Sequence, residues 1–255
     1  MSDESIDTAM TPQQRQFASG SEASALSTYK QVMVGERSWA SFTAFELYRL
    51  CFAGMESILG VGCRRLTLPL FLSACGNGPV IGHGVTIRQP HRISFGKKVI
   101  LDDFSAVDVR SRPGKDPQAG ISLGDYTYVG RYSIVTAKYG VIQLGRACNI
   151  GSYSRIATRD KIEIGASVLI ASYVYIGPGN HGADDLQTPV MEQEMESKGG
   201  VRIGDNSWIG TKATILDGVS IGRDAIVGAH SLVREDVPDR AIVAGAPAKI
   251  IRYRE

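Results

Sequence analysis

The chain lacks an excess of charge of one sign. Its 255 residues include 28 Lys and Arg and 26 Asp and Glu, which gives a formal net charge of +2 at pH 7. Binding to a nucleic-acid backbone needs a strongly basic surface, so we expect no nucleic-acid partner. Hydrophobic residues make up 43% and charged residues 21% of the chain. These values are near globular averages and exclude a wholly disordered or fibrous protein.

The sequence has few cysteines and no long apolar segment. Cys51, Cys63, Cys75 and Cys148 show neither a CxxC motif nor another metal-binding spacing. The N-terminal residues MSDESIDTAM lack the basic and apolar regions of a signal peptide. The longest apolar stretch, residues 66–75, is too short to cross about 30 Å of hydrocarbon. We therefore expect a cytoplasmic protein without a membrane span.

Glycine, in contrast, is abundant, with 29 residues, and it belongs to a repeat. From Ile203 to Val233 an aliphatic residue stands at every sixth position, usually followed by glycine. Small or β-branched residues recur four positions after each aliphatic residue: Ser207, Ala213, Val219, Ala225 and Ser231. The same spacing returns upstream, in blocks of three from Ile81 onward. A period of six matches neither an α-helix nor a simple amphipathic strand.

The repeat predicts a parallel β-helix. If each hexad forms one face of a triangular prism, three hexads make a coil of 18 residues, and about seven coils are present. In this interpretation the aliphatic side chains fill the interior, the small residues cover the inner face, and glycine makes the turn. Coils would stack at the strand spacing of about 4.8 Å. The two ends of such a stack need covers.

The rest of the chain divides around this repeat. We expect a flexible segment at 1–37, a helical cap at 38–78, the β-helix at 79–236 with a long loop at 178–200, and a C-terminal tail at 237–255 that covers the far end. Within the cap, Thr43–Glu46 has the form of a capping box and predicts one helix at about 44–59. Pro69 interrupts the following apolar stretch, which predicts two short helical pieces in the cap.

Three segments carry a resemblance to a known family: GNHGADD around His181, VRIGDNSWIG ending at Gly210, and Ile242–Lys249. Over residues 79–252 the sequence resembles the hexapeptide-repeat acyltransferases, and among them the sugar O-acetyltransferases of surface polysaccharide assembly. The resemblance implies a left-handed β-helix, acetyl-CoA as co-substrate, and a homotrimer with active sites between adjacent subunits. It also implies a sugar or glycan acceptor.

His181 is the candidate general base. It stands at the root of the longest loop, where the family's catalytic histidine is found. An alcohol must lose its proton as it attacks a thioester, and a neutral imidazole suits that task. Asp185 is a candidate to orient this histidine, or else it shapes the loop together with Pro189. The alternative for His181 is a solvated loop residue.

The resemblance also implies positions for the two substrates. Trp208 would line the acyl and acceptor site, or else serve only as a packing residue. Ser154 and Arg155 would contact the acceptor. For acetyl-CoA the residues carried over by position are Thr211, Gly228, Ala229, Lys249 and Arg252. Lys249 and Arg252 suit nucleotide phosphates as charge-assisted donors, although a basic tail can also be a solvated surface.

Other functions stay open at this point. One is a trimeric scaffold without catalysis, and another is an acetyltransferase for an amine or an antibiotic. A third is a zinc enzyme of the carbonic anhydrase type, whose histidines must converge on the metal. His83, His91 and His230 are too scattered for such a cluster, so we assign them surface or packing roles and expect no metal site.

The apolar residues of 42–75 exceed one helical stripe, and Arg64 and Arg65 interrupt them. A broad apolar face beside basic residues is typical of helices that lie in a membrane surface. The alternative is packing on the first coil and on neighbouring subunits. The sequence thus permits a protein peripheral to the inner face of a membrane.

Overall fold

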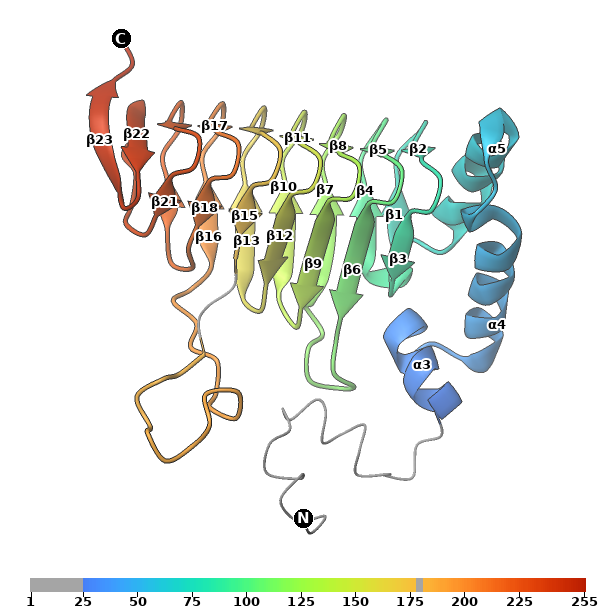
Figure 1. The fold of residues 1–255 in the computed structure, drawn as a ribbon. Helices are drawn as coiled ribbons and strands as arrows, with labels where there is room; N and C mark the ends of the chain where they lie inside the picture. The colour runs from blue at the N-terminus through green and yellow to red at the C-terminus, as the bar shows by residue number, and fades with distance from the viewer. Residues whose placement is uncertain (1–24, 178–180) are drawn as a thin grey trace.

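A computed structural model describes residues 25–177 and 181–255 of the chain (Figure 1). Three helices precede the strands: α3 (Ala25–Val34), α4 (Trp39–Tyr48), which runs into a π-helix (Arg49–Ala53), and α5 (Ser57–Thr67). Short 3-10 helices follow at Leu68–Leu70 and Pro90–Arg92. All the remaining elements are strands, which form three sheets that are parallel except for the last strand pair of one of them.

The sheets are the three faces of a prism. The first face contains β1 (Ala74–Cys75), β4 (Ile93–Phe95), β7 (Gly120–Leu123), β10 (Val141–Leu144), β13 (Lys161–Ile164), β16 (Val201–Ile203) and β19 (Ser220–Ile221). The second contains β2 (Val80–Ile81), β5 (Ile100–Leu101), β8 (Tyr128–Val129), β11 (Asn149–Ile150), β14 (Leu169–Ile170), β17 (Trp208–Ile209), β20 (Ile226–Val227), β22 (Ala241–Gly245) and β23 (Ala248–Tyr253). The third contains β3 (Thr86–Arg88), β6 (Ala106–Arg110), β9 (Ile134–Lys138), β12 (Arg155–Thr158), β15 (Tyr175–Ile176), β18 (Thr214–Ile215) and β21 (Leu232–Val233).

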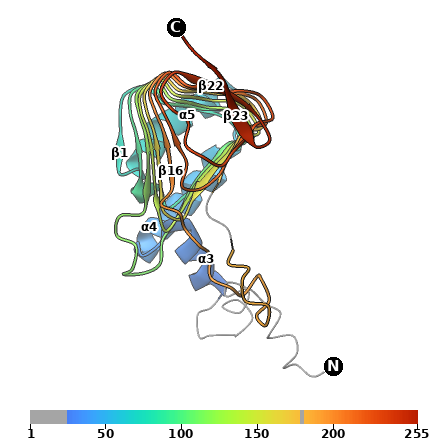
Figure 2. The ribbon, with the colours of Figure 1, turned by 90° about the vertical axis from the view of Figure 1, so that its left-hand side faces the viewer.

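The coils wind left-handed. Figure 2 shows the prism from its C-terminal end, with β1 and β16 of the first face at the left and β22 of the second face at the top. The chain passes from the first face to the second and then to the third, which is clockwise, while each coil lies nearer the viewer than the one before. This confirms the left-handed β-helix of seven coils, against the usual right-handed crossover.

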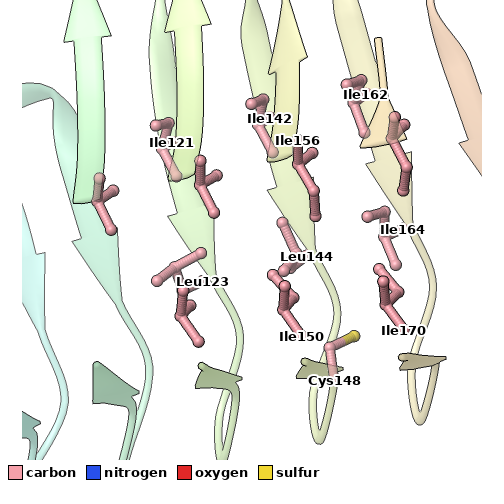
Figure 3. Close-up of a cluster of buried hydrophobic side chains, with 14 of the residues drawn as sticks. Ile121, Leu123, Ile142, Leu144, Cys148, Ile150, Ile156, Ile162, Ile164 and Ile170 are labelled. Atoms are coloured by element: carbon pink, nitrogen blue, oxygen red, sulfur yellow. The ribbon is translucent and has the colours of Figure 1, made fainter. Parts of the chain in front are cut away.

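The interior is a set of aliphatic ladders. Ile142 on β10 lies in register with Ile121 on β7 and Ile162 on β13, and all three are buried (Figure 3). The small or β-branched residues that recur four places after each aliphatic are buried as well: Ser207, Ala213, Val219, Ala225 and Ser231 are at most 2% exposed. Both parts of the hexad pattern therefore face inward, as the sequence predicts.

The predicted role of glycine was wrong in its physical cause. The residues with positive φ at the corners are mostly not glycine, as at Asn206 (φ 57°), Lys212 (φ 57°) and His230 (φ 58°). The glycines after the aliphatic residues instead sit where the next coil comes close. A Cβ on Gly204 would lie 2.6 Å from the backbone nitrogen of Arg223, and one on Gly145 would lie 2.7 Å from the carbonyl carbon of Gly165. The repeat needs glycine there for close approach between coils.

The helical cap differs from the sequence-based expectation. Helix α3 lies within the segment expected to be flexible, and the part of that segment at 1–24 lies outside the described residues. The single helix predicted at 44–59 was wrong, because α4 begins earlier and α5 begins only at Ser57. Ser38 caps α4 by accepting a hydrogen bond from the Ser41 amide, while Thr43 donates to the Trp39 carbonyl inside the helix.

Arg64 joins the cap to the first coil. Its side chain is 1% exposed and donates from Nε to the Ile81 carbonyl on β2 at 2.9 Å. Its Nη1 donates to the carbonyls of Phe52 and Met55 at 2.9 and 2.6 Å. Because these two carbonyls lie at the end of the π-helix and just beyond it, one guanidinium fixes both the break between α4 and α5 and the contact with the β-helix.

The cap leaves a broad apolar surface uncovered. Six of its leucine and isoleucine side chains are 56% to 82% exposed, and we call them the apolar cap surface: Leu47, Leu50, Ile58, Leu59, Leu66 and Leu70. On α5, Ile58 and Leu66 are eight residues apart and share one side of the helix. Among the described residues, no helix is long and apolar enough to cross a membrane.

The C-terminal residues form a hairpin at the other end. Strand β22 pairs in parallel with β20, and β23 pairs antiparallel with β22. The tail therefore extends the second face of the last coil, and in Figure 1 it stands at the end of the prism opposite the helices. The tail thus stands at the end where the sequence analysis expects a cover, as a continuation of one face.

Candidate active site

His181 lies on the long loop between β15 and β16, which hangs below the coils in Figure 1. His181 forms an isolated antiparallel bridge with Met195, and the Gly182 amide donates to the Glu194 carbonyl at 2.9 Å. The histidine is exposed. The two arms of the loop are thus held against each other at the position of the candidate base.

The base of the loop is tied to the neighbouring coils. Asp160 accepts a hydrogen bond from the Ser197 hydroxyl at 2.8 Å, and Asp217 accepts one from the Gly200 amide at 2.9 Å. Gly200 has φ +89°, and a Cβ there would lie 1.8 Å from the Lys161 carbonyl oxygen. Only glycine fits this position, so the root of the loop is sterically fixed.

Asp185 bonds within its own loop. Its carboxylate accepts hydrogen bonds from the Gln187 amide at 2.8 Å and from the Thr188 hydroxyl. These bonds, the hydroxyl first, lower the pKa of Asp185. Gln193 adds two bonds, from Nε2 to the carbonyls of Asp185 and Thr188. Among the described residues the structure gives the Asp185 carboxylate no bond to His181, and the geometry favours the loop-shaping alternative.

A groove opens beside the loop, along the edge between the third and first faces, which we call the loop edge. Its volume is about 430 Å³. The corners at Tyr139 and at 158–160 line it from the coils, and two insertions border it: residues 112–118 from one coil and 195–197 from the long loop. Met195 lines the groove, and its backbone bridges to His181, which is not itself one of the lining residues and lies beside the groove.

The groove contains the ring of Tyr139, which lies close to three basic groups; Lys138 Nζ is 5.5 Å from its centroid. Arg112 Cζ lies 4.4 Å and Arg159 Cζ 5.5 Å from the centroid of Tyr139. Arg112 is also paired with buried Asp116 at 2.6 Å, and its hydrogen bonds lower the pKa of that carboxyl. No motif in the sequence marks Arg112, Tyr139 or Arg159. Counting hexads would have shown that both large insertions leave from the same edge.

The two residues expected to contact the acceptor differ in accessibility. Ser154 is 2% exposed, and its hydroxyl donates to the Ala171 carbonyl at 3.0 Å and accepts from the Val174 amide at 3.1 Å. This hydroxyl belongs to the corner of the coil, and we leave it out of the acceptor site. Arg155 is exposed and lies in register with Tyr175.

The residues expected near acetyl-CoA lie elsewhere on the prism. Trp208 on β17 is 48% exposed and lies in register between Leu169 and Ile226 on the second face. Thr211 donates from its hydroxyl to the Ser172 carbonyl at 2.7 Å, at the edge between the second and third faces. Gly228 and Ala229 occupy the same edge one coil later, and Lys249 and Arg252 are exposed on β23.

The candidate residues therefore form two groups on one chain. The second face, which carries Trp208, is opposite the loop edge, from which the His181 loop hangs (Figure 1). A site that used both groups would combine two copies of the chain.

The other three histidines lie apart from the loop. The ring of His83 meets Phe104 edge-on at 5.0 Å, and the exposed His230 occupies a corner with positive φ. Burial, followed by the charges of Arg37 and Arg92, lowers the pKa of His91 to about 4. Among the described residues no group of three or more His, Cys, Asp or Glu could hold a metal ion.

Comparisons with known proteins agree with this architecture. Residues 200–235 match the family described as bacterial transferase hexapeptide (six repeats). The chain is 35% identical over 169 residues to Rv3034c of Mycobacterium tuberculosis, named a probable acetyltransferase, over 66% of this chain and 54% of that protein. It is 37% identical over 119 residues to a protein of Escherichia coli named "Putative lipopolysaccharide biosynthesis O-acetyl transferase WbbJ", over 44% of this chain and 61% of that protein.

The solved structure of AntD, an N-acyltransferase from Bacillus cereus, aligns with a TM-score of 0.49 at 20% identity, over 79% of this chain and 91% of that one. The chain spans 54% and 61% of the lengths of the two curated relatives. The left-handed coils of three hexads define a hexapeptide-repeat protein. With the matched family model, they show that the chain carries a domain of the bacterial hexapeptide transferase family.

Proposed function

We propose that the protein is an acetyl-CoA-dependent O-acetyltransferase that acts on a sugar hydroxyl of a glycan or glycan precursor. The observation that carries the proposal is the exposed His181, held by a fixed loop at the margin of a groove in a hexapeptide-repeat domain. Two curated relatives named as acetyltransferases support it, one of them for lipopolysaccharide biosynthesis.

In the proposed mechanism His181 acts as general base. Its neutral imidazole takes the proton of the acceptor hydroxyl while that oxygen attacks the thioester carbonyl carbon. Backbone amides stabilise the negative charge that develops on the carbonyl oxygen. When the C–S bond breaks, the imidazolium returns the proton to the departing CoA thiolate. The products are an acetyl ester and CoA, and no metal takes part.

We propose a homotrimer as the working unit. His181 and the Trp208 group lie on opposite sides of one chain, and a trimer would place the loop edge of one subunit beside another face of its neighbour. Acetyl-CoA would lie in the cleft between them, with Lys249 and Arg252 toward its phosphates. In the same proposal Thr211, Gly228 and Ala229 line the cofactor side, and Arg155 lines the acceptor side. The proposed domain boundaries are those that the sequence predicts: 1–37, 38–78, 79–236 and 237–255.

The test is incubation of the protein with acetyl-CoA and a panel of sugars, amines and chloramphenicol, with thiol release and product mass measured. Sugar esters are expected, and hydroxylamine should cleave them, whereas an amide product would resist it. Amide products would show that the acceptor is an amine and not a sugar hydroxyl. Release of no thiol with any acceptor would favour a non-catalytic scaffold.

Chelation is expected to leave activity unchanged. The described residues offer no cluster of metal ligands, and the proposed chemistry needs only an imidazole. Activity is measured before and after dialysis against EDTA, with the metal content of the protein followed in parallel. A loss of activity that zinc restores would contradict the proposal and favour a metal enzyme.

We further propose that the apolar cap surface binds the inner face of a membrane, where lipid-linked glycans are available. Its exposed leucines and isoleucines lie beside Arg65, which suits an anionic lipid surface. Flotation with anionic liposomes is expected to carry the wild-type protein upward. The double variant Leu50→Glu, Ile58→Glu should stay at the bottom, and Leu186→Glu, altered at an exposed loop leucine, should float. Wild-type protein that stays at the bottom would show the cap to be structural only.

A further inference from the structure

A basic row runs along the third face toward the groove. Arg110 on β6 lies in register with Lys138 on β9, and Arg159 follows directly after β12, at the matching place of the next coil. Stacked coils bring such positions to about 4.8 Å at the backbone. Three like charges on successive coils repel one another, which makes this edge receptive to an anion.

Four carboxylates line the groove: Asp116, Asp160, Glu196 and Asp217. Asp160 accepts a hydrogen bond from the Ser197 hydroxyl and Glu196 is exposed, whereas the other carboxylates nearby are bonded to basic groups or to backbone amides. Asp108 is shared between Arg88 at 3.0 Å and Arg110 at 3.4 Å. Asp116 is held by Arg112, as described above, and Asp217 by the amides at the root of the loop. Within the described ranges, the structure gives Arg159 no carboxylate partner.

The lowered pKa of Lys138 is consistent with a positive potential along this row. Its pKa is lowered first by burial and then by the charges of Arg159 and Arg110. A bound anion in the groove would relieve this repulsion.

The walls of the groove are already in place. Arg92 donates to the carbonyls of Asp116, Pro117 and Ala119 at 3.0, 3.1 and 3.3 Å, which fixes the first insertion. Ser197 fixes the second through Asp160. The Tyr139 ring also lines the groove, with Arg112 and Arg159 close to it. A ligand would therefore enter a site whose polar groups need little rearrangement.

We propose that this groove binds an acidic sugar and that Arg159 recognises its negative group, a carboxylate or a phosphate, so that a neighbouring hydroxyl lies toward His181. The inference rests on the proposed acetyl transfer for the role of the bound sugar, but binding itself does not. Arg159, beside the Tyr139 ring, pairs with the anion by charge-assisted hydrogen bonds. Arg112 is held by Asp116, and Lys115 lies on the first insertion, so we assign the selection for charge to Arg159, which stands on the coil itself.

The experiment compares three acceptors of the same ring: galactose, galacturonate and galactose 1-phosphate. Binding to the full-length protein is measured by calorimetry, and KM is measured separately in the acetyl-transfer assay. We expect at least one acidic sugar to bind more tightly than galactose. Comparison of the carboxylate and the phosphate compounds identifies the anion.

The variant Arg159→Gln should weaken binding of the acidic sugar by about 10-fold to 100-fold, the usual range for a lost hydrogen bond between charged groups. It should leave binding of galactose unchanged. Arg146→Gln is the matched control, because Arg146 is exposed on the edge between the first and second faces. Equal affinity for all three sugars, or an Arg159→Gln variant that binds like wild type, would overturn the inference.

The two proposals fail in different ways. If acidic sugars bind and Arg159→Gln abolishes the binding, but no acceptor is acetylated, the acidic-sugar site is supported and the transferase function is contradicted. If wild type and Arg159→Gln acetylate galactose and acidic sugars with the same KM, the transferase function is supported and the acidic-sugar site is contradicted.

Discussion

Replacement of His181 by alanine is expected to lower kcat for acetyl transfer by about 10²–10⁴-fold, the usual contribution of a positioned general acid–base group. The substitution removes the group that would take the proton from the acceptor hydroxyl. It should not disturb the fold, because the side chain is exposed and the bridge to Met195 is made by the backbone. Turnover is measured at saturating acetyl-CoA and acceptor.

The control is Leu186→Ala, a change at a loop residue that is 91% exposed. It should retain wild-type kcat. Melting temperature and oligomer mass of both variants should match those of wild type. A His181→Ala variant with kcat within a factor of two of wild type would remove His181 from the mechanism.

Replacement of Arg64 by methionine is expected to lower the free energy of unfolding by about 3–5 kcal/mol, as when one partner of a buried polar network is removed. Methionine keeps much of the apolar stem but removes every donor. The carbonyls of Ile81, Phe52 and Met55 then lose their bonds to the guanidinium. Urea denaturation at fixed protein concentration measures the change.

Arg65→Met is the matched control, because Arg65 is the exposed neighbour on the same helix. Its free energy of unfolding should stay within about 0.5 kcal/mol of wild type, as for most surface changes. Hydrogen exchange should locate the effect of Arg64→Met in α5 and the start of the β-helix. Equal stability of the two variants would show that the cap does not depend on the Arg64 contacts.

The hexad period predicted much of the fold, because it is a local signal repeated many times. Aliphatic positions such as Ile150 and Ile209 are buried, and so are the small residues four places later, Ser154 and Ala213. The helical cap was less predictable. Its sequence offered Thr43 as a cap, but Ser38 serves instead, and the buried Arg64 contacts carbonyls that lie 9 to 17 residues away in the sequence.

Only part of the candidate site could be predicted from the sequence, for the same reason. The long insertion and its histidine are local features, and the resemblance points to His181. Ser154 was expected to contact the acceptor. Its position in the hexad instead points the hydroxyl into the corner of the coil, where it bonds to the Ala171 carbonyl and the Val174 amide. Accessibility within a hexad depends on which side of the coil a residue faces and on what the next coil brings against it.

The sequence by itself determined the coil: a period of six, three hexads per turn, and an interior of stacked aliphatic side chains. Only the tertiary structure decided that residues 112–118 and 195–197, far apart in the chain, border one groove over Tyr139. Stacking is the physical reason. Each coil advances by only one strand spacing, so insertions that leave the prism at the same edge are brought together whatever their separation in sequence.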